Sequence, residues 1–363
     1  MKTEVSVIVP IYNSKTFLRE CIDSILAQKK VEIEVLLVDS STEKSCSAIC
    51  DEYEKKDARI QVIRQKNDGI SNARNSGMES ATGTYLMFVD SDDYLPQSDC
   101  IKKLFDCIEA AGTDLVVGEY ARLWNGNLLP AASHDAFSQD EPSGMDFRFK
   151  GFFTVGSLSY VWNKLYRRDF LIQHSITFAR YDYAEDKLFN LVCYLNDARY
   201  SFLSETIYVY RKNDASVSFQ YRPNSEQGWI RLASQLKDEL MCAKKQEQMD
   251  LVGNILFFAC FFDAKMEYVF GDRKQKKVRM MLRRYASYPL VRQQFIECVK
   301  GNTTRGVSSL MWRVMIRGFC LGMTLHMYTL IAFGIRCLIE WKIDERLSDT
   351  GKRDRKHDKA ISD

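Results

Sequence analysis

"GTYLMFVDSDDYLP", residues 83–96, is the stretch that decides the fold. It begins as a continuous apolar run, residues 85–89, and then turns abruptly acidic at Asp90, Asp92 and Asp93. An uninterrupted apolar run of this length is typical of a strand that is buried on both faces. Carboxylates this close together repel one another, and their pKa values rise unless a positive charge lies among them. The segment is therefore either a solvated turn or a site that holds a cation.

Similar apolar runs recur along the first part of the chain and alternate with helical patterns. We expect strands at residues 5–11, 34–39, 60–63, 85–89 and 114–120. Apolar residues recur at helical spacing over 17–26, and further helices are expected through 48–56, from the polar stretch 67–77 and near 98–111. Buried strands that alternate with helices predict an α/β fold with a mostly parallel, Rossmann-like sheet flanked by helices. From about residue 225 only helical patterns remain, which predicts a C-terminal helical region.

Three polar groups follow three of these strands. They are Pro10–Asn13, Asp39 and the acidic cluster 90–93. A parallel sheet binds its ligands beyond the carboxyl ends of its strands, so the shared placement predicts one site rather than three unrelated turns. The carboxylates suit Mn²⁺ or Mg²⁺, which take oxygen ligands and commonly share them with substrate phosphates.

At this point the sequence resembles a known family, the family 2 glycosyltransferases of GT-A fold, which occur in bacterial polysaccharide and lipopolysaccharide synthesis. The resemblance rests on segments that follow one another across residues 4–218: "VSVIVPIYN", "EVLLVDSSTE", "NDGISNARNSGMESATGTYLMFVDSDDYL", "VWNKLYRRDF", "YAEDKLF" and "YVYRKNDASVS". It implies an inverting, metal-dependent transfer of a sugar from a nucleotide-diphosphate-sugar, with UDP expected, to a hydroxyl group. The acceptor would be a lipid-linked glycan or a polysaccharide of the cell surface.

The resemblance also implies roles on the donor side. The turn after the first strand would contact the base, and Asp39 would bind the uracil or ribose. Arg74 would pair with the phosphates or with an acid of the metal turn, and Arg211 would neutralise the leaving diphosphate. The expected metal ligands are Asp90, Asp92 and Asp93. The full set expected to bind the nucleotide-sugar is Pro10, Tyr12, Asn13, Asp39, Asp68, Arg74, Asp90, Ser91, Asp92 and Arg211.

On the acceptor side, the "YAEDKLF" segment supplies two carboxylates. An inverting displacement needs one general base, which we assign to Asp186, with a supporting or acceptor-binding role for Glu185. The alternative is a pair of acids that only complements the dipole of a helix N-terminus. Trp162 and Asn163 could line the sugar or acceptor pocket, although a core position is an equal alternative for Trp162.

One departure from the family pattern bears on the donor. The family usually carries two adjacent aspartates after the second strand, and here Asp39 is followed by Ser40. Ser40 forms hydrogen bonds but carries no charge, so either the donor is unusual or the position is a tolerant contact. The departure leaves room for an alternative function, a catalytically silent, membrane-attached scaffold or binding protein. A nicotinamide dehydrogenase is excluded because "PIYNSK" has no glycine after the first strand.

The C-terminal third combines positive charge with an apolar run. Residues 273–317 hold twelve Lys or Arg against one acid, and residues 319–335 are almost wholly apolar. The run could be a buried helix, a helix in the membrane interface or a short membrane span. The basic block favours a membrane surface over nucleic acid, so we expect a cytoplasmic protein at the inner face of the cytoplasmic membrane.

The expected organisation has three parts. They are a catalytic domain over 1–222, a helical region over 223–345 and a charged, disordered tail over 346–363. Within the first part, residues 124–150 read as a loop, because they are rich in Asn, Gly, Pro, Ser and Asp. The eleven cysteines show no paired spacing, which indicates reduced thiols in the cytosol and argues against a zinc site.

Overall fold

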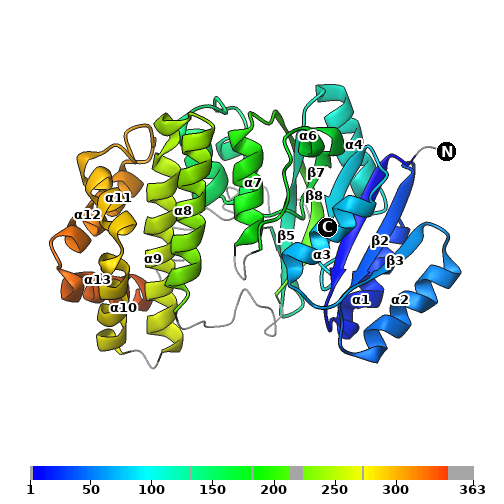
Figure 1. The fold of residues 1–363 in the computed structure, drawn as a ribbon, viewed down its shortest axis with the longest axis horizontal. Coiled ribbons are helices and arrows are strands. Elements are labelled where there is room, and N and C mark those ends of the chain that lie inside the picture. The colour runs from blue at the N-terminus through cyan, green and yellow to red at the C-terminus, as the bar shows by residue number, and fades with distance from the viewer. Residues whose placement is uncertain (1–2, 131–132, 181–183, 213–223, 272–273, 342–363) are drawn as a thin grey trace, which may run out of the picture. The chain divides into compact units, whose positions relative to one another are not determined.

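A computed structural model describes residues 3–130, 133–180, 184–212, 224–271 and 274–341 (Figure 1). The chain divides into two compact units. The sheet unit comprises residues 1–138 and 157–214, and the helical unit comprises residues 139–156 and 215–349. The expected charged tail, 346–363, lies outside the described residues.

The sheet unit is built on a central sheet of eight strands, as the α/β prediction requires. Its strands lie in the order β3-β2-β1-β4-β7-β5-β6, and β8 pairs with β5. They are β1 (Val5–Ile11), β2 (Ile33–Asp39), β3 (Ile60–Arg64), β4 (Tyr85–Phe88), β5 (Leu115–Trp124), β6 (Asn127–Pro130), β7 (Lys164–Arg167) and β8 (Tyr200–Arg211). The pairs β1–β2, β2–β3, β1–β4 and β5–β8 are parallel, whereas the described part of β7 pairs antiparallel with β4 and β5.

Helices connect these strands and cover the sheet. They are α1 (Lys15–Leu26), α2 (Lys44–Lys56), α3 (Ile70–Ser80), α4 (Cys100–Ala111), α6 (Arg168–Gln173) and α7 (Glu185–Leu195). Helix α3 approaches β1 closely at Gly77, where an added Cβ would lie 2.4 Å from Cγ2 of Ile8. A glycine is therefore needed at this point of α3, one turn after Arg74.

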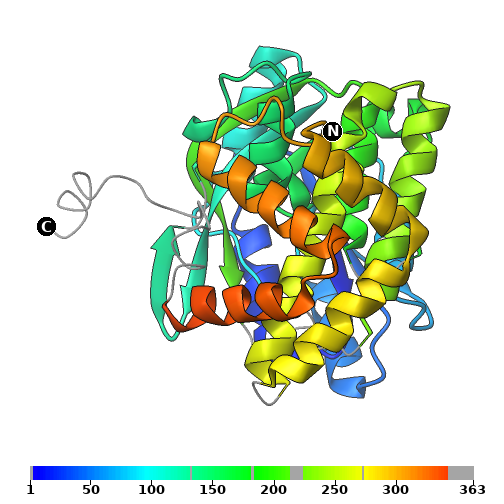
Figure 2. The same ribbon diagram turned by 90° about the vertical axis from the view of Figure 1, so that its left-hand side faces the viewer.

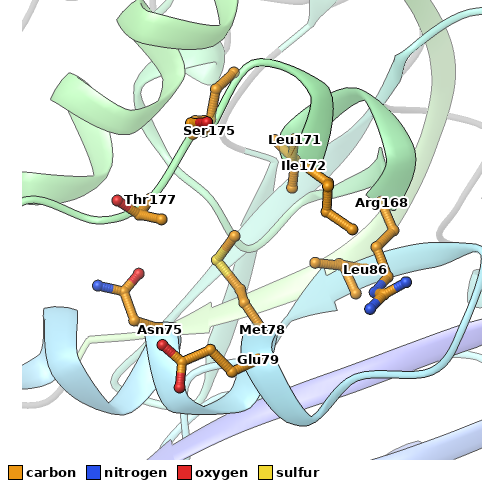
Figure 3. A pocket seen from close by; sticks show the side chains of 10 residues that line it. Asn75, Met78, Glu79, Leu86, Arg168, Leu171, Ile172, Ser175 and Thr177 are labelled. Atoms are coloured by element: carbon orange, nitrogen blue, oxygen red, sulfur yellow. The ribbon is translucent and has the colours of Figure 1, made fainter.

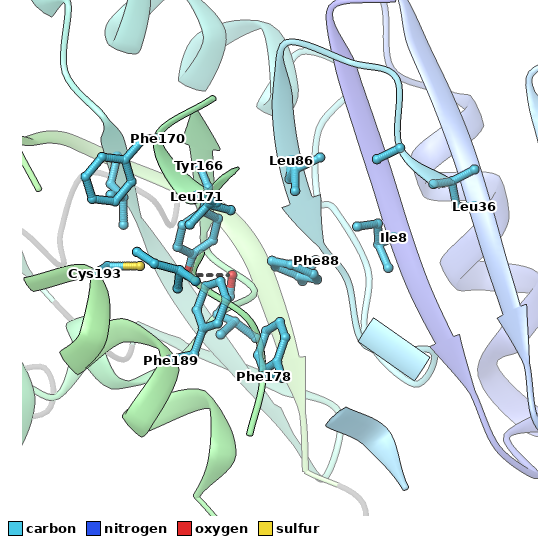
Figure 4. Packing of buried hydrophobic residues seen from close by; sticks show 14 of the residues in the cluster. Ile8, Leu36, Leu86, Phe88, Tyr166, Phe170, Leu171, Phe178, Phe189 and Cys193 are labelled. Atoms are coloured by element: carbon cyan, nitrogen blue, oxygen red, sulfur yellow. Dashed lines mark hydrogen bonds between the residues drawn. The ribbon is translucent and has the colours of Figure 1, made fainter. Parts of the chain in front are cut away.

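An aromatic cluster joins α7 to the sheet (Figure 4). The ring of Phe88 at the end of β4 makes edge contacts with Tyr166, Phe178 and Phe189, at centroid distances of 5.7, 5.2 and 6.1 Å. Phe178 and Phe189 stack at 4.1 Å. Buried aromatic pairs of this kind stabilise by about 0.5–1.5 kcal/mol each beyond their buried area. This packing fixes the start of α7 near the carboxyl end of β4.

The expectation of a loop over 124–150 is wrong. Strands β5 and β6 form a hairpin whose turn is Asn125–Gly126, with φ values of 49° and 78°. Asn and Gly are common in loops, but the Asn-Gly pair between two strands is a strong hairpin signal. A second element, α5 (Met145–Phe149), packs within the helical unit, where Arg148 forms a buried ion pair of 2.6 Å with Asp250. Long-range pairing of this kind leaves no local pattern in the sequence.

The helical unit contains the remaining helices, as expected from about residue 225. Besides α5 they are α8 (Glu226–Cys242), α9 (Asp250–Phe270), α10 (Gln275–Ser287), α11 (Pro289–Lys300), α12 (Leu310–Thr324) and α13 (Tyr328–Glu340) (Figure 2). The apolar run 319–335 is split between α12 and α13 by a turn at His326, whose φ is 59°. In the described part of the chain, no helix is both long enough and apolar enough to cross a membrane.

Candidate active site

The predicted donor-side groups meet at one edge of the sheet unit. Ile11 and Asp39, the last residues of β1 and β2, are directly paired, and β4 lies on the other side of β1. The acidic turn 90–93 follows β4, so all three groups lie beyond neighbouring strand ends. The ring of Tyr12 is 51% exposed at this edge, which leaves it able to contact a ligand.

Asp39 is buried and is held by three donors. Its carboxylate accepts hydrogen bonds from the Ser41 amide at 3.0 Å, the Ser47 hydroxyl at 2.6 Å and Arg64 at 2.9 Å. The neighbouring Ser40 donates its hydroxyl to the main-chain oxygen of Ile11 at 3.1 Å. Ser40 therefore ties β2 to β1, and the position that usually carries a second aspartate serves here to link two strands.

Asn13 organises the turn after β1. Its φ of 50° lies in the left-handed region, which asparagine tolerates better than most residues. Its side-chain oxygen accepts hydrogen bonds from the amides of Thr42 and Glu43 at 3.1 and 3.2 Å. These contacts join the turn after β1 to the loop after β2, and Pro10 precedes them as a buried residue of β1.

Within the acidic turn, Asp93 has a different environment from its neighbours. Its side chain is buried and accepts hydrogen bonds from the Tyr208 hydroxyl and the Arg211 amide, both at 2.7 Å. Burial, followed by the charges of Asp92 and Asp90, raises the pKa of Asp93 well above its usual value. Both carboxylate oxygens thus serve to attach the turn to β8. Asp92 is half-buried, and Ser91, which lies between Asp90 and Asp92, is buried.

Arg211, at the end of β8, also holds the acidic turn. It donates to the main-chain oxygen of Asp92 at 2.9 Å and forms an ion pair of 2.7 Å with Glu20 of α1. Its guanidinium lies 4.4 Å from the ring centroid of Phe17. These contacts make Arg211 a link between β8, α1 and the turn, beside the predicted phosphate position.

Arg74 joins the donor-side and acceptor-side groups. Its buried guanidinium pairs with Glu185 at 2.7 Å and with Asp90 at 3.1 Å, and it lies over the ring of Phe178. Burial alone would lower the pKa of Arg74, and the two carboxylates raise it above its ordinary value. The structure therefore brings together three predicted site residues from α3, the acidic turn and α7.

Asp186 follows Glu185 in the first turn of α7. Burial, and then repulsion by Glu185, raise the pKa of Asp186 to about 7, while Arg74 acts in the opposite direction. A carboxyl group with a pKa near neutrality is well matched to accept a proton at physiological pH.

The position of Asp186 depends on Asn190, one turn later. The side-chain amide of Asn190 donates to the main-chain oxygens of Asp186 at 2.9 Å and Tyr160 at 3.2 Å, and its oxygen accepts from the Tyr166 hydroxyl at 2.9 Å. The ammonium of Lys164 also donates to the Tyr160 oxygen, and burial lowers its pKa to about 7. A buried polar network therefore fixes the first turn of α7 against residues 157–160.

Trp162 and Asn163 are both buried. The Trp162 ring stacks on Tyr208 at 4.6 Å, and the Asn163 amide donates to the main-chain oxygen of Gly118 at 2.7 Å. The Asn163 side-chain oxygen accepts from Lys164 at 2.7 Å. Trp162 thus has a core position, which was the alternative expected for it. Asn163 links β5 to the segment before β7.

Asp68 lies at the protein surface. Its side chain is 59% exposed just before α3 and forms an ion pair of 3.5 Å with Arg180. The residues missed from the sequence are those that support the site, namely Glu20, Arg64, Tyr208 and Asn190. Tyr208 lies in the alternating segment "TIYVY" of β8, which signals only a strand, so no local pattern could reveal its bond to Asp93.

The described residues contain no group of three or more His, Cys, Asp or Glu side chains that could hold a metal ion by themselves. The donor set still fits the expected Mn²⁺ or Mg²⁺. Mg²⁺ is commonly bound by one or two carboxylates together with substrate phosphates and water, so a preformed cage is not required. Asp90 and Asp92 provide two carboxylates at the strand ends, whereas both carboxylate oxygens of Asp93 accept hydrogen bonds from residues of β8.

A separate cavity of about 390 Å³ lies between α3 and α6 (Figure 3). Its lining is mainly apolar and includes Met78, Leu86, Leu171 and Ile172. It contains none of the predicted site residues.

Comparisons with known proteins identify the family and the fold. Residues 6–173 match the family described as Glycosyl transferase family 2. The chain is 32% identical over 305 residues to EpsJ of Bacillus subtilis strain 168, described as an uncharacterized glycosyltransferase, and covers 85% of it. The matched region is 80% of this chain.

A second similarity is to TarS of Staphylococcus aureus, a poly(ribitol-phosphate) beta-N-acetylglucosaminyltransferase. The sequences are 29% identical over 209 residues, which are 56% of this chain and 35% of TarS. The crystal structure of TarS 1–349 in complex with UDP-GlcNAc superimposes with a TM-score of 0.66 at 21% identity and covers 92% of both chains. At this identity the superposition establishes the shared GT-A fold.

Proposed function

The chain belongs to glycosyl transferase family 2, and from this premise we propose that it is an inverting, metal-dependent glycosyltransferase with a UDP-sugar donor. The acceptor is a hydroxyl group of a lipid-linked glycan or a polysaccharide. The observation that carries the proposal is the Arg74 guanidinium, which holds Glu185 and Asp90 together. It brings the acidic turn, which suits a metal and diphosphate, close to a helix that starts with a candidate base.

The donor is the less defined half of the proposal. The crystal structure of TarS contains UDP-GlcNAc, and the TarS name specifies transfer of N-acetylglucosamine to poly(ribitol-phosphate). These facts about a relative of the same fold support UDP-sugars as the first donors to test. The buried Ser40, which replaces the second aspartate of the family pattern, leaves Asp39 as the anionic group for uracil or ribose.

On the donor side, the exposed ring of Tyr12 stacks on the base, and the turn at Pro10–Asn13 offers main-chain groups to it. Asp39 accepts a hydrogen bond from the uracil or ribose. Asp92 and Asp90 would hold the divalent ion, which would neutralise charge on the diphosphate. Asp93 and Arg211 keep the acidic turn in place, and Arg211 adds positive charge near the leaving group.

On the acceptor side, Asp186 is the general base. The acceptor oxygen attacks the anomeric carbon in line with the leaving group, so the new glycosidic bond forms as the bond to the diphosphate breaks. Asp186 takes the hydroxyl proton, and the nucleoside diphosphate leaves with the electron pair of the broken bond. Glu185 holds Arg74 and keeps the pKa of Asp186 raised.

We propose a cytoplasmic location at the inner face of the membrane, where a lipid-linked acceptor is presented. The basic composition of residues 273–317 supports this location. Nucleic acid is not the expected partner of this region.

A donor screen tests the proposal. Thermal unfolding is measured with UDP-glucose, UDP-N-acetylglucosamine and UDP-galactose, each with and without Mn²⁺. We expect one donor to raise Tm only when the metal is present, because a ligand that binds only the folded state stabilises it. That donor should then be consumed, by transfer or by slow hydrolysis. Metal-dependent binding without any turnover would instead support the alternative of a silent binding protein.

A further inference from the structure

The helical unit exposes an unusual amount of apolar surface on its last two helices. On α12 and the following turn, Leu310, Val314, Leu321 and Leu325 are 66, 63, 44 and 58% exposed. Leu330 and Phe333 of α13 are 59 and 53% exposed. We call these six residues the apolar face. Figure 2 views the helical unit from the side on which α12 and α13 lie in front. Exposed apolar side chains gathered on neighbouring helices often mark a site of interaction.

The pattern of α12 distinguishes the apolar face from scattered surface leucines. Residues 310, 314, 321 and 325 recur at helical spacing and form one stripe. The opposite side of the same helix is also apolar, because Trp312, Ile316, Cys320 and Met323 are buried in the helical unit. Arg313 and Arg317 lie between the two apolar sides of α12, so the outer apolar stripe is flanked by positive charge. An exposed stripe of this kind favours an apolar partner.

The segment that carries the apolar face is rich in positive charge, although Asp146 accepts a hydrogen bond from the Ser308 amide just before α12 and Glu340 ends α13. Residues 298–339 contain no Asp or Glu. Near the start of α13, Arg279 donates to the Thr329 hydroxyl at 3.5 Å, and Arg283 lies 5.8 Å from the ring centroid of Tyr328. Arg292 is close enough to act on the pKa of the same tyrosine. These three cations thus lie beside the start of α13.

We propose that the apolar face docks on an anionic lipid bilayer, with α12 lying in the plane of the interface. Leu310, Val314 and Leu321 would enter the boundary between headgroups and acyl chains, and Arg279, Arg283 and Arg292 would contact lipid phosphates. Apolar side chains bordered by arginines are the composition of helices that bind in a membrane interface. This docking rests on the helical unit alone and does not depend on the identity of the donor or acceptor.

A second copy of the chain is a less suitable partner. In a two-fold symmetric dimer the same surface would face itself, so two surfaces with an excess of positive charge would meet. Residues 298–339 contain no carboxylate to offset this excess, which disfavours the contact. Anionic lipids supply the missing negative charge.

Co-sedimentation of the full chain with vesicles tests the docking. We expect binding to vesicles of equal parts phosphatidylcholine and phosphatidylglycerol, and weaker binding to phosphatidylcholine alone. The variant Val314→Asp/Leu321→Asp should lose roughly tenfold or more of its binding, because it removes two apolar insertions and adds two negative charges. The variant Arg279→Gln/Arg283→Gln should lose roughly fivefold per charge on anionic vesicles only.

A matched variant controls for added charge. Ile172→Asp/Met241→Asp also places two acids at exposed apolar positions, 58 and 49% exposed, but on other helices, α6 and α8. It should bind vesicles as the unchanged protein does. Because all the substituted aliphatic side chains are exposed, the variants should fold, which circular dichroism checks. Two results would overturn the proposal: equal binding by the Val314→Asp/Leu321→Asp variant, or an oligomer in light scattering that this variant dissociates.

Discussion

Arg74 and Glu185 form a buried ion pair of 2.7 Å across 111 positions of sequence, and the second terminal nitrogen of the same guanidinium holds Asp90. The pair connects α3 to the first turn of α7. Because Glu185 is followed directly by Asp186, the contact positions the proposed base relative to the acidic turn. A single buried arginine thus links the two halves of the site.

Removing Arg74 should damage both stability and activity. Arg74→Met leaves Glu185 and Asp90 without their shared cation, and breaking a buried pair in this way costs about 3–5 kcal/mol. The double variant Arg74→Met/Glu185→Gln should recover part of that loss, since it removes one uncompensated charge. Urea unfolding of the single and double variants measures the coupling.

An exposed pair provides the comparison for Arg74. Arg19 and Glu52 lie 2.6 Å apart, with side chains 49 and 36% exposed. Arg19→Met should therefore change the free energy of unfolding by no more than about 1 kcal/mol. Equal effects of Arg19→Met and Arg74→Met would contradict the special role of the buried pair.

Asp186→Asn should slow sugar transfer by roughly 10²–10⁴-fold, the usual contribution of a general base, and leave donor affinity unchanged. Steady-state kinetics and donor titration measure the two effects separately. Asp169→Asn is the matched control, because Asp169 is an exposed carboxylate in the first turn of α6. It removes the same favourable charge from a helix N-terminus and should leave kcat unchanged. A loss of donor binding in Asp186→Asn would assign Asp186 to the donor side instead.

The pH profile should report Asp186. With a pKa of about 7, the base is protonated and inactive at low pH, so kcat/KM should rise with pH and level off above about 7. Glu185 raises this pKa, and therefore Glu185→Gln should shift the rising limb to lower pH. If the rising limb of the pH profile did not move in Glu185→Gln, then a group other than Asp186 would be titrating.

The same raised pKa has a consequence for stability. The folded state binds the Asp186 proton more tightly than the unfolded chain does, so this group opposes folding increasingly as pH rises from about 4 to 7. Asp186→Asn should then raise Tm more at pH 8 than at pH 5. A Tm difference that is the same at both pH values would argue against a raised pKa.

Neighbouring aspartates of the acidic turn should respond differently to the same substitution. Asp92→Asn should abolish the metal-dependent part of UDP binding, measured by calorimetry with Mn²⁺, and leave Tm in the absence of ligand unchanged. Asp93→Asn should lower that Tm, because Asp93 accepts hydrogen bonds from Tyr208 and Arg211. If Asp93→Asn abolished the metal-dependent binding and Asp92→Asn lowered Tm, then Asp93 would be the metal ligand.

The sequence predicted those parts of the fold that have local signals. Continuous apolar runs identified β1, β2 and β4, and helical patterns identified α1 and α4. The shared placement of polar residues at strand ends also indicated which of them would meet. The composition of residues 124–150 predicts a loop and hides the hairpin at Asn125–Gly126, although this pair is a known turn signal.

The support of the site could not be predicted in the same way. From the sequence, Asp93 is equivalent to Asp90 and Asp92. Only the structure shows that Tyr208, 115 positions away, donates a hydrogen bond to it. Asn163 reads as a possible acceptor contact until its bonds to Gly118 and Lys164 are known. Such roles depend on pairings between distant strands, which leave no periodicity in the chain.

Asn190 offers the sharpest test of positioning at the base. Its side-chain amide donates to the main-chain oxygen of Asp186, four residues earlier, and to that of Tyr160. Asn190→Ala should lower kcat by roughly tenfold through misplacement of Asp186, with donor KM unchanged. Asn196→Ala is a matched control, because Asn196 makes the same bond to the residue four earlier, Val192, at the other end of α7. If both variants lose stability but keep kcat, then Asn190 only supports the helix. If kcat falls in Asn190→Ala alone, then the buried network sets the position of the base.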